Sequence, residues 1–307
     1  MNDELDYEKA LMIKTAWYYY IENYTQQKIS DLLGISRIRV IKLLERARQT
    51  EIIQFKLHQD NKLRMETEAQ LISRFGLNDV FVVPSTVEGN TNENVARAAA
   101  MYISNRLDDK SVINMGYGDT LSRVLNHLAT TSESPLSVVS LTGGVNHYLP
   151  NTTSSIFNAK LYLMPTPLIV QSPEIVDAML LEPVVKEIKH LIPLSSMTVV
   201  GIGAISDDAT ILNSGILRKN DFMQLKMKDS VGDILCHFID SNGNLVENEV
   251  EHRLLSTSLD TLRTLHNVIG VAAGDSKVPA ILAALRGKYL NTLVTDEDTA
   301  NKLLALV

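Results

Sequence analysis

Cysteine and long apolar runs are nearly absent from this sequence. Cys236 is the single cysteine among 307 residues, which excludes an internal disulfide and any zinc site built from several thiolates. No uninterrupted apolar stretch approaches the about 18 residues that a transmembrane helix requires. The first residues are acidic, whereas a secretory signal begins with positive charge. These absences predict a cytoplasmic protein with no membrane contact.

Positive charge is also scarce overall, with 29 Lys and Arg against 36 Asp and Glu and a net charge of -7. Taken as a whole, this balance is not typical of a protein that binds nucleic acid. The segment from Lys9 to His58 differs, because it holds nine basic residues and only four acidic ones. Five of these cations lie between Arg37 and Arg48, and Glu45 is the one acid among them.

The residues before this basic segment predict two short helices joined by a tight turn. Thr25 and Ser36 are suited to cap the two helices, and Gly34 is suited to end the first. Ile29 and Val40 begin the inner faces of the two helices, and further apolar residues follow at helical spacing. This pattern is typical of a helix-turn-helix module.

The outer face of the second helix carries guanidinium and ammonium groups. A basic run is often only a solvated helix face, but a cationic second helix behind a tight turn is suited to the major groove of duplex DNA. The candidate DNA contacts are Thr25, Gln26, Ser36, Arg37, Arg39, Lys42 and Arg46. Double-stranded operator DNA is therefore the predicted partner.

Two flanking segments complete the predicted N-terminal domain, residues 1–58. A long amphipathic helix is expected from Tyr7 to Asn23, with Trp17 in the small core that such a module must build. The alternation from Ile52 to Leu57 predicts a short strand or wing. A charged helix from Asn61 to Gly76 is expected to link the two domains, residues 1–58 and 59–307.

The remainder of the chain predicts an α/β fold, with helices on both sides of a mostly parallel sheet. The expected strands are Asp79–Val83, Val112–Met115, Val138–Leu141, Thr198–Ile202, Val268–Ala272 and Asn291–Val294. Ligands of such sheets bind where the strands end. The segments singled out there are 116–120, 142–148 and 201–208, together with 286–291, which leads into the last strand.

Two of these loops begin like a dinucleotide fingerprint, but Leu121 and Ser206 occupy the place of its third glycine. A nicotinamide cofactor is therefore not expected. A glycine loop with the Thr120 hydroxyl at a helix start instead suits a phosphate, although glycine after a strand often serves only a tight turn. Asp207 and Asp208 are interpreted as solvated, and His147 lacks a second histidine at metal-ligand spacing.

With these motifs together, the chain resembles the SorC family of sugar-responsive bacterial transcriptional regulators, especially the branch containing the repressor of autoinducer-2 uptake. The resemblance covers nearly the whole chain. It rests on residues 24–37, 142–145, 199–204, 231–234 and 287–295. It implies a Rossmann-like effector domain related to sugar-phosphate isomerases, a phosphorylated sugar as effector, and a homo-oligomer that is a dimer or a tetramer.

The resemblance also implies an effector pocket. The matching positions are Gly116, Tyr117, Gly118, Gly143, Gly144, Asn146, Gln171, Asp233 and Lys288. Amide groups and Lys288 suit a phosphate, whereas Asp233 and Asn146 suit sugar hydroxyls. Asp233 as a helix cap or as a partner of a backbone turn, and Lys288 as a surface lysine at the start of a strand, remain alternatives. Because Thr142 stands where some members carry a Schiff-base lysine, no covalent effector is expected.

The hypothesis is a DNA-binding repressor of a carbohydrate operon, with no catalytic residue, cofactor or metal. A sugar-phosphate isomerase with an N-terminal interaction module is the competing interpretation, and it predicts the same pocket. No acid or histidine stands in an isomerase motif, however, and catalysis does not need the Arg37–Arg46 helix. A pure oligomeric scaffold explains neither the glycine loops nor that helix.

Overall fold

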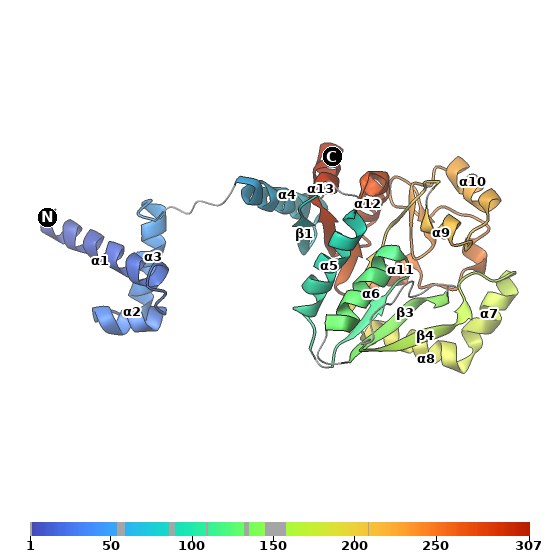
Figure 1. Ribbon diagram of the computed structural model, residues 1–307, viewed down its shortest axis with the longest axis horizontal. Helices are drawn as coiled ribbons and strands as arrows, with labels where there is room; N and C mark the ends of the chain where they lie inside the picture. The colour runs from blue at the N-terminus through green and yellow to red at the C-terminus, as the bar shows by residue number, and fades with distance from the viewer. Residues whose placement is uncertain are drawn as a thin grey trace. The chain divides into compact units, whose positions relative to one another are not determined.

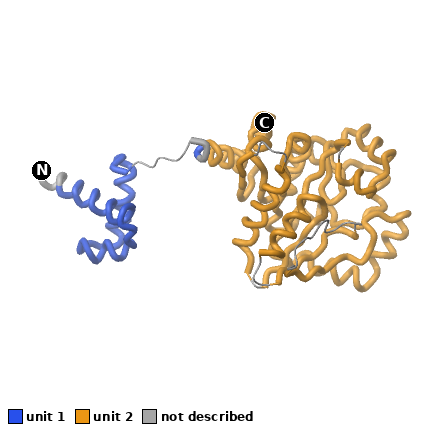
Figure 2. Tube along the Cα trace, viewed as in Figure 1, with its two compact units in different colours: residues 1–62 blue, residues 63–307 orange. Residues whose placement is uncertain are grey.

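The computed structural model describes residues 2–53, 59–85, 90–108, 110–131, 135–144, 158–207 and 209–307. It separates into two compact units, residues 1–62 and 63–307 (Figure 2). Within the described residues, no helix is both long and apolar enough to cross a bilayer.

The first unit is built from three helices, α1 (Asn2–Tyr20), α2 (Gln26–Leu33) and α3 (Arg37–Gln49). The Thr25 hydroxyl accepts a hydrogen bond from the Lys28 amide, and the Ser36 hydroxyl accepts one from the Arg39 amide. Gly34 ends α2 in the left-handed conformation, at φ 63°, which glycine adopts without strain. The predicted caps and turn between the two helices are therefore present.

The core of this unit differs from the expected one at Trp17. We predicted that Trp17 is buried, but 55% of it is exposed, and its indole Nε1 donates to Glu22 Oε1 at 3.2 Å. The side of α1 that packs on α3 carries smaller residues, among them Ala16, which lets the two helices approach closely. The prediction for Trp17 was wrong because the other side of α1 faces inward.

Only the first two residues of the predicted wing lie within the described part of the chain. Ile52 and Ile53 are half-buried against the cluster that includes Leu43 and Ala47, and they adopt bends rather than a strand. Residues 54–57 lie outside the described residues.

The second unit alternates strands and helices (Figure 1). The helices are α4 (Gln59–Phe75), which begins just before the division between the units, α5 (Thr91–Ser104), α6 (Asp119–Thr131), α7 (Pro173–Leu181), α8 (Pro183–Leu191), α9 (Thr210–Asn213), α10 (Lys219–Met227), α11 (Leu259–Thr264), α12 (Val278–Arg286) and α13 (Glu297–Ala305). The strands are β1 (Asp79–Val83), β2 (Val112–Met115), β3 (Leu136–Gly144), β4 (Ala159–Pro167), β5 (Met197–Gly201), β6 (Gly203–Ala204), β7 (Gly232–Ile234), β8 (His237–Ile239), β9 (Val268–Val271) and β10 (Thr292–Asp296).

Seven strands form one sheet in the order β1-β10-β9-β5-β2-β3-β4. Every neighbouring pair in it is parallel. The six predicted strands all belong to this sheet, which confirms the α/β class. The chain adds β3 and β4 on one side of β2 and then places β5 on the other side. This change of direction between β2 and β5 is where open α/β sheets form a binding crevice.

Helices cover both faces of the sheet and bury its apolar side chains. On one face α5 and α6 pack with Ile113 and Val199, and on the other face α4, α8, α12 and α13 pack with Val139 and Val200. Alternate residues of a strand point to opposite faces, and Val199 and Val200 follow this rule. Strands buried on both sides explain why the sequence runs here are continuously apolar rather than alternating.

A smaller antiparallel sheet, β6-β7-β8, lies beyond the end of β5, and sequence analysis did not predict it. Together with α9 and α10 it surrounds a separate cluster that contains Phe222 and Phe238. The pairing of Gly203 with Asp233 joins β6 to β7. This sheet brings a segment from residue 232 back to the end of β5, next to the crevice.

Candidate functional site

Three of the predicted DNA contacts lie on the exposed side of α3. Arg37, Arg39 and Lys42 are exposed, whereas Val40, Leu43, Leu44 and Ala47 are buried on the opposite side of the helix. Arg37 Nε donates to Gln26 Oε1 at 3.4 Å, so these two predicted residues contact each other across the turn.

Arg46 differs from the other predicted contacts. Its guanidinium lies 3.0 Å from the Glu8 carboxylate of α1, and its side chain is about half-exposed, at 51%. This exposed pair holds Arg46 toward α1, so any contact of Arg46 with a phosphate would compete with Glu8.

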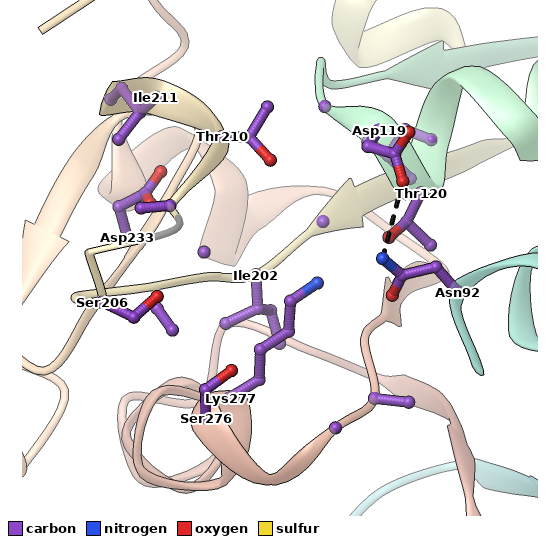
Figure 3. Close-up of a pocket in the computed structure, with 18 of the residues that line it drawn as sticks. Asn92, Asp119, Thr120, Ile202, Ser206, Thr210, Ile211, Asp233, Ser276 and Lys277 are labelled. Carbon is purple, nitrogen blue, oxygen red and sulfur yellow. Dashed lines mark hydrogen bonds between the residues drawn. The ribbon is translucent and has the colours of Figure 1, made fainter. Parts of the chain in front are cut away.

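A cavity of about 430 Å³ opens at the carboxyl ends of β2, β5 and β9. Tyr117 and Gly118 of the loop after β2 line it. Thr120, at the start of α6, and Asp233 also belong to the lining (Figure 3). The segments 201–204 and 273–277 complete much of its wall. The volume is within the range of small-molecule sites.

The two ends of the cavity differ in chemistry. In Figure 3, Asp233, Thr210 and Ser206 lie on one side, and Thr120 and Asn92 lie on the other. Lys277 extends its ammonium group into the space toward Thr120 and Asn92. α6 begins at Asp119, directly after Gly118 at φ 127°, so its first amide groups have no partner within the helix.

Asp233 is a buried carboxyl group in the wall of this cavity, with 7% of the residue exposed. Its Oδ2 accepts a hydrogen bond from the Cys236 amide at 3.1 Å. Burial raises its pKa from 3.8 to about 6, although the Cys236 amide and the charges of His237 and Lys277 oppose this shift. Asp233 therefore lines the cavity and also binds the turn between β7 and β8, as expected for a partner of a backbone turn.

The Tyr117 hydroxyl lies 3.1 Å from Cys236 Sγ. Burial raises the pKa of both groups well above their ordinary values, so Tyr117 stays a neutral phenol and Cys236 a neutral thiol. The only cysteine is therefore a buried packing group beside the cavity rather than a reactive thiolate.

Charged residues of α5 and α6 form a network at the Thr120 end. Arg123 binds Asp119 at 3.0 Å and Glu93 at 2.8 Å, and His127 Nε2 lies 2.7 Å from Glu93. The hydrogen bond from Arg123 is the largest cause of the lowered pKa of Glu93. Asn92 also donates to Asp119 at 3.5 Å. The network fixes α5 against the start of α6.

The structure does not bring every predicted effector residue to the cavity. Gly116 is buried at the end of β2 behind the lining, and Gln171 is exposed after β4. Gly143 lies where β3 and β4 shift register, and a Cβ there would overlap the carbonyl oxygen of Pro167. Gly144 ends the same strand without lining the cavity, and Asn146 lies outside the described residues.

Lys288 lies at the opposite edge of the sheet, because its loop precedes β10 instead of following a strand. It is exposed, with φ 56°, and lies outside the cavity lining. This position matches its alternative as a surface lysine.

Four residues that line the cavity were not predicted from the sequence: Asn92, Thr210, Ser276 and Lys277. Lys277 follows β9, a strand that the sequence predicted, so inspection of the loop after that strand would have found it. Asp207 is exposed and forms an ion pair with Lys226 at 2.8 Å, in agreement with a solvated carboxylate. Asp208 and His147 lie outside the described residues, among which no cluster of metal-ligating side chains occurs.

Replacement of Asp233 by Asn should alter the pH dependence of stability. A raised carboxyl pKa favours the neutral form in the folded state, so its stabilising effect is complete below about pH 3.8 and is lost as pH rises through about 6. In urea unfolding, the free energy of unfolding of Asp233→Asn should therefore rise relative to that of wild type by about 2 kcal/mol between pH 4.5 and 7.5. Asp207→Asn is the exposed control, and an equal shift in both variants would contradict the assignment.

Known proteins match the chain along nearly its whole length. The sequence model of the family described as "Putative sugar-binding domain" matches residues 59–305. "Transcriptional regulator LsrR" of Klebsiella pneumoniae is 34% identical over 303 residues, which covers 97% of this chain and 94% of that protein. The protein of the same name from Escherichia coli K12 is 33% identical over 301 residues, with 97% and 95% covered.

Solved structures agree with this match. The full-length sorbitol operon regulator SorC from Klebsiella pneumoniae superposes with a TM-score of 0.70 at 28% identity, covering 96% of this chain and 98% of that one. A transcriptional regulator from Streptococcus pneumoniae gives a TM-score of 0.71 at 26% identity, covering 81% and 99%. Because these relatives are regulators, the isomerase alternative is set aside. The chain belongs to the SorC and LsrR family of transcriptional regulators that carry this sugar-binding domain.

Proposed function

We propose that this chain represses a carbohydrate uptake or catabolism operon in the cytoplasm, and that a phosphorylated sugar releases it from operator DNA. One observation carries the proposal: a single chain combines a capped, exposed cationic helix with a polar cavity at the switch point of a parallel sheet. The LsrR and SorC relatives support the regulatory role.

On the DNA side, α3 is the proposed recognition helix. The first turn of such a helix contacts base edges, and the preceding helix crosses the phosphate backbone. Arg37 and Arg39 lie in that first turn, and Thr25 and Gln26 lie at the start of α2. Ser36 contributes by capping α3, and Lys42 follows one turn later on the exposed side.

Arg39→Ala should weaken operator binding by about 1 to 3 kcal/mol if Arg39 reads a base. Arg48→Ala is the matched control, because Arg48 is exposed on the same helix but lies in its last turn. Fluorescence anisotropy at fixed salt measures both variants. An equal loss for the two would show that α3 contributes only general positive charge.

On the effector side, we propose that the phosphate lies between the start of α6 and Lys277. Amide groups at a helix start favour an anion, Thr120 adds a hydroxyl, and Lys277 adds a positive charge on the same side of the cavity. The sugar hydroxyls then face Asp233 and Thr210. We assign the phosphate contact to Lys277 rather than to Lys288, because Lys277 belongs to the cavity lining and Lys288 does not.

Lys277→Ala should weaken a sugar phosphate far more than the matching unphosphorylated sugar, because only the phosphate presents a dianion to the ammonium group. Calorimetric titration with pairs of sugars and sugar phosphates measures this difference. Lys288→Ala is the control and should leave both affinities unchanged. The same selective loss in Lys288→Ala, with none in Lys277→Ala, would restore the assignment made from sequence.

A dimer or tetramer is proposed because operators pair half-sites. Ile13, Trp17 and Ile21 recur at a spacing of four residues along α1 and the turn after it, and each is at least 46% exposed. Such a stripe suits the α1 of a second copy. It provides a surface on which two recognition helices are held together.

Trp17→Ala should shift the assembly toward smaller species in sedimentation velocity at micromolar concentration, because the largest side chain of the stripe is lost. Met227→Ala, at an exposed position of α10, is the control. A wild-type chain that is a strict monomer and binds a single half-site tightly would refute the proposed dimer.

A further inference from the structure

Ile38 is a large apolar side chain on the proposed recognition surface, and it is 67% exposed. It is the second residue of α3, between Arg37 and Arg39. Single exposed aliphatic residues are common on proteins, but this one lies in the middle of the most cationic surface of the unit. Lys42 follows it one turn later.

The packing of α3 fixes the direction in which Ile38 points. Val40, Leu43, Leu44 and Ala47 are nearly inaccessible to solvent and define the inner stripe of the helix. At 3.6 residues per turn, positions 38 and 42 fall opposite that stripe and lie one above the other. Ile38 therefore points directly away from the inner stripe, whereas Arg37 and Arg39 flank the outer face.

The start of α3 is held in place by two contacts. The Ser36 hydroxyl caps the Arg39 amide at 3.2 Å, and Arg37 is hydrogen-bonded to Gln26 of α2. Ile38 is β-branched, so its χ1 angle is restricted within a helix. A rigid apolar group on a fixed turn loses little conformational entropy when it is buried in a complex.

The major groove offers one methyl group on a base edge, the 5-methyl group of thymine. The other groups that distinguish the base pairs there are hydrogen-bond donors and acceptors, which an isoleucine cannot satisfy. An isoleucine that enters the groove against any other base leaves polar atoms without partners, at a cost in free energy. The apolar side chain of Ile38 therefore favours thymine over the other bases.

We propose that Ile38 is a specificity-determining residue that reads one thymine of each half-site through its 5-methyl group. The inference rests on the proposed binding of operator DNA by α3. Ile41, which is 42% exposed and one turn from Ile38, extends the apolar surface beside it. Arg37, Arg39 and Lys42 supply the charge that holds this surface in the groove.

The test uses the full-length chain and a duplex that the wild-type chain selects from a randomised pool. Each thymine of one half-site is replaced in turn by uracil, which lacks only the 5-methyl group. At one position the wild-type affinity should fall about fourfold, which corresponds to about 0.8 kcal/mol for one buried methylene-sized group. In Ile38→Ala, the same uracil substitution should cause no further loss.

Leu32→Ala is the matched control, because Leu32 is an exposed aliphatic residue of α2, at 53%. It should retain the fourfold loss on uracil. Ile38→Ala removes no buried contact, and circular dichroism should show unchanged helix content. Ile38→Val, which keeps a β-branched group, should retain part of the uracil effect.

Two results would overturn the inference while leaving DNA binding intact. One is a wild-type affinity that no uracil substitution changes, and the other is a uracil effect that persists undiminished in Ile38→Ala. A change of sedimentation behaviour in Ile38→Ala, without thymine dependence, would assign the side chain to contact between copies instead. Failure of the wild-type chain to enrich any duplex would refute the proposed DNA binding itself.

Discussion

Parallel pairing of β9, β5 and β2 at the centre of the large sheet is the constraint on which the effector unit depends. Parallel neighbours place their carboxyl ends at one edge, so three loops from distant parts of the sequence must meet there. The chain adds strands first on one side of β2 and then, from β5 on, on the other side. This switch in strand order keeps the adjoining helices apart and leaves room for a ligand. The cavity is thus a consequence of strand order, and the loops only decide its chemistry.

The small antiparallel sheet borders this crevice and places the buried carboxyl group of Asp233 in its wall. A Cβ on Gly203 would overlap the Asp233 carboxylate, so the glycine permits the approach of β7. Burial disfavours the charged form of Asp233, and the Cys236 amide with the nearby positive charges offsets only part of that cost. A buried carboxyl group with perturbed pKa in a cavity marks a candidate functional residue, and we propose that Asp233 binds hydroxyl groups of the effector.

Much of this architecture could be predicted because its strands are buried on both faces, as the apolar runs around Val138 and Val199 show. β4 was missed, since most of its residues are exposed or half-buried and it includes Lys160 and two prolines, Pro165 and Pro167. The strands of the small sheet have two or three residues each, too few for a period to show. Trp17 was misplaced because side-chain size was taken as a sign of burial, whereas close packing of α1 on α3 needs small residues such as Ala16.

The candidate site also contains residues that could be predicted from the sequence and residues that could not. Tyr117, Gly118 and Thr120 reach the cavity because they follow the central strand β2, and Asp233 reaches it because β7 pairs with β6, which comes directly after β5. Lys288 does not, since a residue that precedes a strand emerges at the opposite edge. Residues such as Asn92 and Thr210 belong to segments whose approach to the cavity depends on helix packing, which no local pattern in the sequence encodes.

We propose that effector and operator bind two arrangements of the same assembly with different affinities. By linkage, the factor by which a sugar phosphate weakens operator binding must equal the factor by which operator weakens sugar-phosphate binding. The measurement is a pair of titrations with the full-length chain, its selected operator, and the tightest ligand from a panel of hexose and pentose phosphates. The account predicts two equal factors of roughly 5 to 150, and a ligand that fills the cavity with the same affinity in the presence and absence of operator would contradict it.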